Sequence, residues 1–128
     1  MINFEISRTF SVSANALYKA WLNSEQHSEM TGGEAQCSNQ EADSFTAWDG
    51  YISGVNLELI PNRRIVQHWR TVEFKDSDEY SMLEIEFQPI NGGTILKLRH
   101  SKIPDGQPDY EKGWIDSYFD PMTQYFNS

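Results

Sequence analysis

The stretch Gly93-Thr94-Ile95-Leu96-Lys97-Leu98-Arg99-His100 decides the fold, together with the amphipathic segment that closes the chain. Within this stretch apolar and charged side chains alternate, which is the period of a half-buried strand. A loop rich in Pro and Gly, 103–108, follows the strand. Beyond it Tyr110, Trp114 and Tyr118 recur every four residues and mark one face of a helix. A strand that leads into a long closing helix predicts a curved antiparallel sheet wrapped around that helix.

The preceding sequence predicts two short helices and several more strands. A strand from Ile2 to Phe10 alternates apolar and polar residues, and Ser13 can cap a helix over 14–22. Asn23 or Ser24 can cap a second helix that ends near Glu29. Six further strands are expected at 34–37, 44–48, 51–60, 64–72, 80–88 and 94–101. This order indicates an α+β fold with a six- to seven-stranded antiparallel sheet and two short helices after the first strand.

The sequence pattern also predicts which residues of the strand 51–60 share a face and where the closing helix is interrupted. In the strand 51–60, the residues expected to share one face are Val55, Leu57 and Leu59, with Asn56 and Glu58 on the other. Asp109 is expected to cap the closing helix. Pro121 lies inside that helix, where it removes a backbone donor, so we expect a kink or a restart near Phe119.

Composition and charge exclude several classes of protein. The 128 residues fit a single domain, 1–128, and the formal net charge of −9 disfavours binding to nucleic acid or to an anionic membrane surface. Cys37 is the single cysteine, which excludes an intrachain disulfide and favours a reducing compartment. The N-terminus does not resemble a signal peptide, and no apolar run approaches the ~18 residues of a membrane helix. We therefore expect a soluble, cytoplasmic protein without a membrane span.

The polar residues do not form a recognisable catalytic or metal-binding motif. His27, His68 and His100 have no zinc-like spacing, and one cysteine cannot form a thiolate cluster. The acidic pair Glu84 and Glu86 alternates with apolar residues, as on a solvated strand face. We therefore predict no metal, no cofactor and no catalytic residue. His100 shares the apolar face of its strand, either as a hydrogen-bonded histidine at a cavity edge or as a polar group that orients a ligand.

Aromatic residues make up 13% of the chain and need either a large core or a lined pocket. Stripes at helical spacing usually pack in a core, whereas ligand sites are mainly apolar with few polar groups, and one residue can serve both purposes. The candidate cavity residues are Trp48, Trp69, Leu83, Ile85, Leu98, His100, Trp114, Tyr118 and Phe119.

Several phrases, taken in order, carry a resemblance to a known family. They are Val12-Ser13-Ala14-Asn15-Ala16-Leu17-Tyr18-Lys19-Ala20-Trp21, Asp49-Gly50-Tyr51-Ile52-Ser53-Gly54, Pro61-Asn62-Arg63-Arg64-Ile65-Val66-Gln67-His68-Trp69-Arg70, the strand 93–100 and Gly113-Trp114. This arrangement resembles the START-like, or helix-grip, superfamily. More particularly, it resembles the family named for the C-terminal domain of the Hsp90 ATPase activator. One departure is Glu29-Met30-Thr31-Gly32, which stands where such domains often have a Trp-Gly phrase.

Three functions follow as hypotheses. The first is a non-catalytic module that holds an apolar or amphipathic small molecule between the sheet and the closing helix, with His100 as a polar anchor. The second, implied by the resemblance, is a stress-related or chaperone-associated interaction domain with a protein partner. The third is a cyclase-like or hydrolase-like enzyme of related grip folds, which would need polar groups converging inside the shell. A sizeable cavity favours the first hypothesis, and an exposed apolar or charged patch favours the second.

Overall fold

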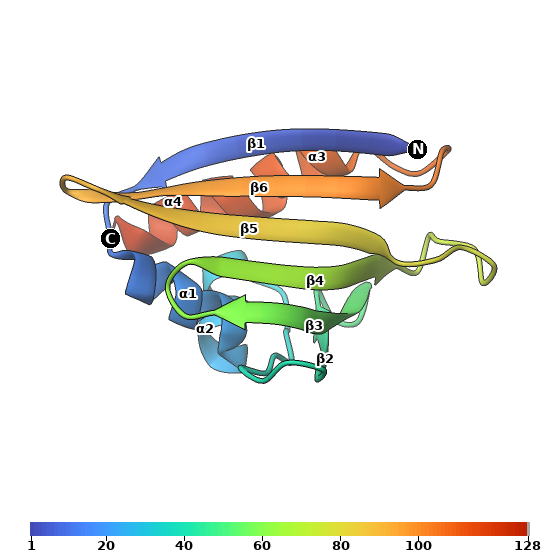
Figure 1. Ribbon diagram of the computed structural model, residues 1–128, viewed down its shortest axis with the longest axis horizontal. Helices are drawn as coiled ribbons and strands as arrows, with labels where there is room; N and C mark the ends of the chain where they lie inside the picture. The colour runs from blue at the N-terminus through green and yellow to red at the C-terminus, as the bar shows by residue number, and fades with distance from the viewer. Residues whose placement is uncertain (128) are drawn as a thin grey trace.

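The computed structural model describes residues 1–127 as an antiparallel sheet with helices against one face (Figure 1). The sheet order is β1-β6-β5-β4-β3-β2. Its strands are β1 (Ile2–Phe10), β2 (Ser44–Ala47), β3 (Ile52–Ile60), β4 (Arg64–Thr71), β5 (Ser81–Ile90) and β6 (Gly93–Ile103). The helices are α1 (Ala14–Leu22), α2 (Ser24–Thr31), α3 (Tyr110–Trp114), a π-helical turn (Ile115–Phe119) and α4 (Asp120–Phe126). The predicted α+β architecture, with a six-stranded sheet packed around the C-terminal helix, is confirmed.

Side-chain caps set the start of the helices where the sequence predicts them. Ser13 caps α1, Asn23 caps α2 and Asp109 caps α3. In each case the side-chain oxygen accepts a hydrogen bond from the backbone N–H three residues further on. Each cap thus satisfies a backbone donor that the first turn of a helix leaves without a partner. Gly32 ends α2 in the left-handed conformation, with φ of 89°.

The closing helix changes form before Pro121, as predicted. The Asp120 N–H donates to the carbonyl of Ile115, five residues back, which defines the π-helical turn. Pro121 then occupies the first turn of α4, where its missing N–H costs no helical hydrogen bond. The wider turn also separates the proline ring from the preceding carbonyls that a regular helix would press against it. Among residues 1–127, no helix is both long and apolar enough to cross a membrane.

The core fills the space between the sheet and the helices. Fully buried side chains come from both layers: Leu17, Met30, Ile65, Leu83, Ile85, Leu96, Leu98, Phe119 and Met122. Arg8 on β1 donates to Asp120 at 2.7 Å and to Thr123 at 3.2 Å, which ties the edge strand to α4. The helices are therefore held by apolar burial in the centre and by an ion pair at the edge.

The outer face of the sheet is charged and internally paired. Arg99 contacts Glu5 at 2.9 Å and Glu84 at 3.5 Å, and Arg64 contacts Glu58 at 2.9 Å and Glu84 at 3.4 Å. These groups are partly exposed, so each pair adds little to stability. Their alternation with core residues confirms that Glu84 lies on a solvated strand face.

Two predictions about strands are wrong. The segment 34–37 is no strand, because its ladder is one isolated bridge between Gln36 and Thr46, so the sheet has six strands and not seven. The predicted faces of β3 also fail: Asn56 and Glu58 were expected on one face, but Asn56 is buried whereas Glu58 is exposed. A β-bulge between Asn56 and Glu58 shifts the register there. The Asn56 amide donates to the carbonyls of Ser38 and Gln40 and accepts from Gln67, so every polar atom is satisfied.

Candidate functional site

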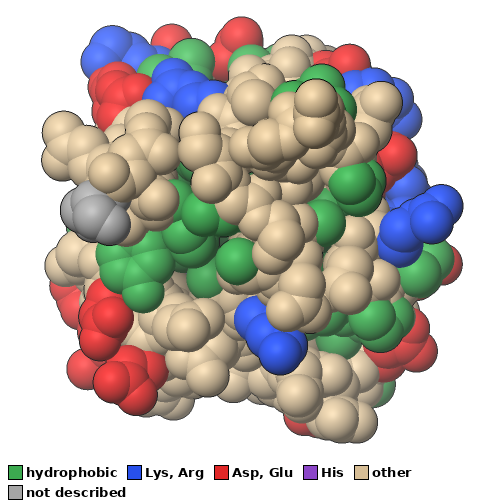
Figure 2. All heavy atoms as spheres, turned by 90° about the vertical axis from the view of Figure 1, so that its left-hand side faces the viewer, with side chains coloured by type: hydrophobic (Ala, Val, Ile, Leu, Met, Phe, Trp, Pro, Cys, Tyr) green, Lys and Arg blue, Asp and Glu red, His purple; other side chains and the backbone are tan. Residues whose placement is uncertain are grey.

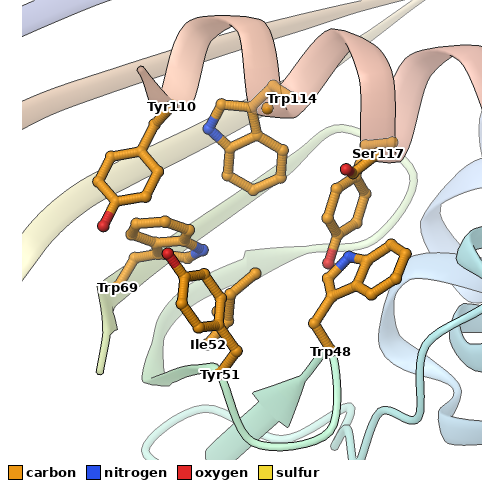
Figure 3. Close-up of a pocket in the computed structure, with 9 residues that line it drawn as sticks. Trp48, Tyr51, Ile52, Trp69, Tyr110, Trp114 and Ser117 are labelled. Atoms are coloured by element: carbon orange, nitrogen blue, oxygen red, sulfur yellow. The ribbon is translucent and has the colours of Figure 1, made fainter. Parts of the chain in front are cut away.

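An aromatic cavity of about 320 Å³ lies between the closing helical segment and the turn that joins β2 to β3. Figure 3 shows rings from the helix and from the sheet side facing one another across it. The lining residues are Trp48, Tyr51, Ile52, Trp69, Tyr110, Gly113, Trp114, Ser117 and Tyr118. This lining contains no charged side chain. The volume is at the lower end of the range for small-molecule sites, about 300–1,000 Å³.

The turn between β2 and β3 places Trp48 at the cavity. Trp48 and Asp49 have φ values of 51° and 59°, in the left-handed region that bulky residues rarely adopt. The Tyr51 N–H donates to the Trp48 carbonyl, and the Asp49 N–H donates to the Glu34 carbonyl, both at 3.0 Å. Gly33 lies over the face of the indole, where an added Cβ would come within 2.5 Å of Cε3 and 2.7 Å of Cδ2. This close approach holds the indole at the cavity wall, opposite the helix that carries Trp114 (Figure 3).

The helix and β4 supply the aromatic wall. The ring centroids of Trp114 and Tyr118 are 4.7 Å apart, and those of Trp69 and Trp114 are 5.6 Å apart. Tyr110 meets Trp69 edge to face at 5.0 Å. The helical residues recur every four positions, so one face of the helix presents all three rings to β4. Aromatic contacts of this geometry add to the burial energy of each ring.

Below this wall a hydrogen-bond chain satisfies the buried polar groups. We call it the His100 chain. Trp114 Nε1–H donates to His100 Nδ1 at 3.0 Å, and His100 Nε2 lies 2.8 Å from Ser81 Oγ. Ser81 Oγ–H in turn donates to the Trp69 carbonyl at 2.6 Å. An indole nitrogen can only donate, so His100 Nδ1 carries no proton and Nε2–H donates to Ser81. Burial lowers the pKa of His100 to about 3, so the ring is neutral. His100 is therefore held by the fold and does not line the cavity.

A second buried histidine fixes Tyr118. His27 Nδ1–H donates to the Trp21 carbonyl at 2.8 Å, so its Nε2 accepts from the Tyr118 hydroxyl at 2.8 Å. Burial lowers the pKa of His27, although its hydrogen bond to the Trp21 carbonyl opposes this. Burial likewise raises the pKa of Tyr118. Both groups stay uncharged near neutral pH, which suits a structural pair better than acid–base chemistry.

The structure brings four of the nine predicted site residues to the cavity: Trp48, Trp69, Trp114 and Tyr118. The other five lie away from the lining, with Leu83, Ile85, Leu98 and Phe119 in the core and His100 beneath the aromatic wall. Sequence reasoning missed five lining residues: Tyr51, Ile52, Tyr110, Gly113 and Ser117. The helical spacing with Trp114 could have identified Tyr110. Tyr51 has no such signal, because it reaches the cavity only through the turn at Trp48.

The other candidate groups do not gather at this site. Burial raises the pKa of the Cys37 thiol to about 11, so it is not an activated thiolate near neutral pH. Within residues 1–127, no three His, Cys, Asp or Glu residues come together as a metal site. His68 stacks on Tyr80 on the outer face, with ring centroids 5.1 Å apart.

Comparison with known proteins assigns the family. The family model for "Activator of Hsp90 ATPase homolog 1-like protein" matches residues 11–127. The chain belongs to this family. The matched region spans both N-terminal helices, five of the six strands, the cavity and the closing helix. The resemblance drawn from the sequence phrases is confirmed.

Curated relatives carry the name of Hsp90 ATPase activators. "Activator of 90 kDa heat shock protein ATPase homolog 1" of Homo sapiens is 26% identical over 122 residues, which are 94% of this chain and 36% of that protein. The homologue of Dictyostelium discoideum is 27% identical over 126 residues, 96% of this chain and 32% of that protein. The chain thus spans about a third of the length of these Hsp90-activator relatives.

Solved structures share the fold of this Hsp90-activator-like chain. An HSP90 activator from Plasmodium falciparum has a TM-score of 0.89 and 23% identity, with 99% of this chain and 97% of that chain covered. The Aha1 dimer from Colwellia psychrerythraea has a TM-score of 0.78 and 12% identity, with 99% and 95% covered. At these identities the structures establish the helix-grip fold and leave function to other arguments.

Proposed function

We propose that this chain is a chaperone-associated interaction domain whose partner is an Hsp90-type ATPase. The observation that carries the proposal is the family match over residues 11–127, together with relatives named as Hsp90 ATPase activators. Because the chain spans about a third of those relatives, stimulation of the ATPase is part of the proposal. The stress-related role and the cytoplasmic location predicted from the sequence fit such a partner and stay predictions.

One end of the molecule exposes apolar side chains on two turns, which could contact a protein partner. Ile60 at the β3–β4 turn and Ile90 at the β5–β6 turn are large apolar side chains with exposed fractions of 44% and 39%. Both turns lie at the left-hand end in Figure 1. Figure 2 views this end and shows hydrophobic side chains gathered near its middle, with acidic groups at the margin. Exposed apolar side chains on one end of a molecule are candidates for a protein contact.

The test is binding to the Hsp90 of the same organism, with its ATPase rate measured in parallel. We expect measurable binding and a changed ATPase rate for the wild type. The double variant Ile60→Asp/Ile90→Asp should weaken binding at least about tenfold, because it places a charge at each of the two exposed apolar positions. Val72→Asp is the matched control, since Val72 is 71% exposed at the other end of β4. No binding by a folded wild type would refute the proposal, and equal binding by both variants would refute a role for Ile60 and Ile90 in the contact.

A second candidate function is supported by the cavity itself. We propose that the uncharged aromatic cavity holds a small apolar or amphipathic molecule without catalysis. The support is its volume of about 320 Å³ and its lining of rings from two layers of the fold. The described residues offer no activated nucleophile there, which makes the enzyme hypothesis the weakest of the three.

Native mass spectrometry of protein purified from its own host tests this second function. A reproducible non-covalent adduct, absent under denaturing conditions, is expected for the wild type. Gly113→Leu is the control, because a Cβ at Gly113 meets no atom within 4 Å and the longer side chain enters the open space at the cavity wall. Loss of the adduct in this variant would assign it to the cavity. An adduct that persists there would place the molecule elsewhere, and a bare wild type would favour the chaperone role alone.

A further inference from the structure

The aromatic rings on one wall of the cavity are steeply inclined to one another. The plane of Trp114 makes an angle of 43° with that of Trp69 and of 52° with that of Tyr118. Tyr110 stands at 81° to Trp69. A flat ligand stacks best on rings that are close to parallel, whereas inclined rings surround a rounded group. The shape of this wall therefore favours a compact, rounded chemical group.

Two further rings lie across the open space from this wall. Figure 3 shows Trp48 and Tyr51, at the turn between β2 and β3, on the side opposite Trp114. Gly33 covers one face of the Trp48 indole, which leaves the other face to line the cavity. Six aromatic side chains thus line it: Trp48, Tyr51, Trp69, Tyr110, Trp114 and Tyr118. Trp and Tyr have the most electron-rich ring faces among the side chains.

The tyrosine hydroxyls of the helix wall are already used by the fold. Tyr118 donates to His27 Nε2 at 2.8 Å, and Tyr110 donates to Gln107 Oε1 at 2.8 Å. The Ser117 hydroxyl also lines the cavity and can serve one polar atom of a ligand. A ligand group that brings several N–H donors would therefore leave some of them without an acceptor.

The charge next to the cavity is negative. Tyr51 O–H donates to Glu73 Oε2 at 3.3 Å in an exposed hydrogen bond, so a carboxylate lies at the solvent-facing edge of the lining. The lining itself contains no Lys, Arg or His, and the chain has a net charge of −9. An anion in the cavity would be buried without a counter-charge, whereas a cation is attracted to its opening.

We propose that the cavity binds the methylated ammonium head of a small molecule in a cage of aromatic rings. This inference rests on the proposed ligand-binding role and adds the chemical class of the ligand. A quaternary ammonium group is rounded and positively charged and has no N–H to satisfy, so it needs ring faces and no hydrogen-bond acceptor. The volume of about 320 Å³ leaves room for a short substituent, with the Ser117 hydroxyl as a partner for its polar atom.

Choline and 3,3-dimethylbutan-1-ol test the charge, because they have the same shape and differ only in nitrogen or carbon at the centre. Each carries nine equivalent methyl protons, so an NMR titration of that signal gives both dissociation constants. We expect choline to bind the wild type about tenfold more tightly, although the neutral alcohol loses its water more easily. Ethanolamine has the charge without the methyl groups and should bind at least about tenfold more weakly than choline.

Two variants of one residue test the ring. Trp48→Leu and Trp48→Phe both shorten the side chain, but only phenylalanine keeps an aromatic face. Trp48→Leu should weaken choline binding about fivefold and Trp48→Phe by less, while the affinity for the neutral alcohol should differ little between the two. Equal choline affinities in these variants would place the cation away from Trp48 and overturn this cage.

A matched pair of charge variants tests the carboxylate. Glu73→Gln keeps an acceptor for the Tyr51 hydroxyl and removes the charge, so it should weaken choline binding about two- to threefold at low salt. Glu86→Gln is the control, because it makes the same change on the outer face of the sheet, where Glu86 contacts Arg64. Equal affinities in the two variants would remove Glu73 from the site.

The remaining outcomes separate this inference from the ligand-binding role. If the neutral alcohol binds as tightly as choline, the cation requirement is wrong and the role stands. If all three compounds fail to bind while native mass spectrometry shows an adduct, the chemical class alone is wrong; with a bare protein as well, both proposals fail. The comparison in the wild type needs no variant, so misfolding of a variant does not remove the test.

Phosphocholine distinguishes a free amine from a lipid headgroup that carries the same cation. Its phosphate would lie near the Glu73 carboxylate, so we expect it to bind more weakly than choline. Tighter binding of phosphocholine would overturn the assignment to a free small molecule and indicate a lipid headgroup instead.

Discussion

Trp114 and Trp48 line the same cavity, yet they belong to two different regions. Trp114 lies on α3, is 3% exposed and donates to His100 in the His100 chain. Trp48 lies on a turn, is half-buried, has a left-handed backbone and lacks an acceptor among the described residues. The indole nitrogen of Trp114 is therefore hydrogen-bonded within the fold, whereas that of Trp48 has no partner among the described residues. The two tryptophans therefore differ less in burial than in whether the polar atom of the ring has a hydrogen-bond partner.

The largest expected effect is on stability and separates the two tryptophans directly. Trp114→Ala should lower the free energy of unfolding by about 3–5 kcal/mol, because it removes a packed ring and leaves the acceptor of His100 unpaired. Trp48→Ala should cost less than about 1.5 kcal/mol, since the ring is half-buried and its rare backbone conformation offsets part of its packing. Urea denaturation followed by circular dichroism measures both. Similar losses for the two variants would contradict the comparison.

The next effect is the pH dependence that the two buried histidines impose. Burial lowers the pKa of His100 to about 3, whereas a histidine in the unfolded chain titrates near 6.5. Below about pH 6.5 the unfolded chain binds a proton that the folded chain does not, so stability falls as pH falls toward 3. The slope is up to about 1.4 kcal/mol per pH unit for each such group. His27, whose pKa burial also lowers, acts in the same direction.

The control isolates His100 from the carboxylates that also titrate in acid. His100→Asn removes one titrating group and keeps a side chain that can accept from Trp114. Its free energy of unfolding should therefore fall less steeply than that of the wild type between about pH 6.5 and 5, by close to one proton in the slope. An unchanged slope would show that His100 is protonated in the folded protein and that the direction of the hydrogen bonds in the His100 chain is wrong.

Alternation and capping were enough to predict most of the fold. Ser13, Asn23 and Asp109 cap their helices as expected, because capping depends on a few neighbouring residues. The faces of β3 could not be predicted, since a β-bulge after Asn56 reverses the alternation and no local pattern marks it. Asn56 is buried because its amide binds carbonyls of the 38–43 loop, a contact between segments distant in sequence.

The candidate site was predictable where it lies on a helix and not where it lies on the turn. Trp114 and Tyr118 share a helical stripe, so their common orientation follows from spacing. Leu83 and Leu98 have an equally apolar alternation, yet the helix covers them and they become core. Tyr51 enters the cavity because Trp48 and Asp49 turn the chain in the left-handed region. Sequence reasoning had no means to foresee that conformation at a tryptophan.

A smaller effect is expected at the base of the cavity. Tyr118→Phe removes the hydroxyl that donates to His27 Nε2 and should lower the free energy of unfolding by about 1–2 kcal/mol, because a buried acceptor loses its partner. Tyr80→Phe is the control on the exposed outer face and should change stability by less than about 0.5 kcal/mol. A loss in Tyr118→Phe no greater than that of the control would mean that the Tyr118–His27 hydrogen bond contributes nothing.

The smallest effect is a gain of stability at the cavity wall. Gly113 lies inside α3 without a positive φ, and an added Cβ there meets no atom within 4 Å, so Gly113→Ala should stabilise the protein by about 0.5–1 kcal/mol. Gly54→Ala is the opposite case, because its Cβ would collide with the His68 carbonyl. If Gly113→Ala also weakens choline binding, a position that is suboptimal for the helix has been kept open for a ligand. A stabilised variant with unchanged affinity would instead place the bound molecule nearer the turn, toward Trp48 and away from the helix.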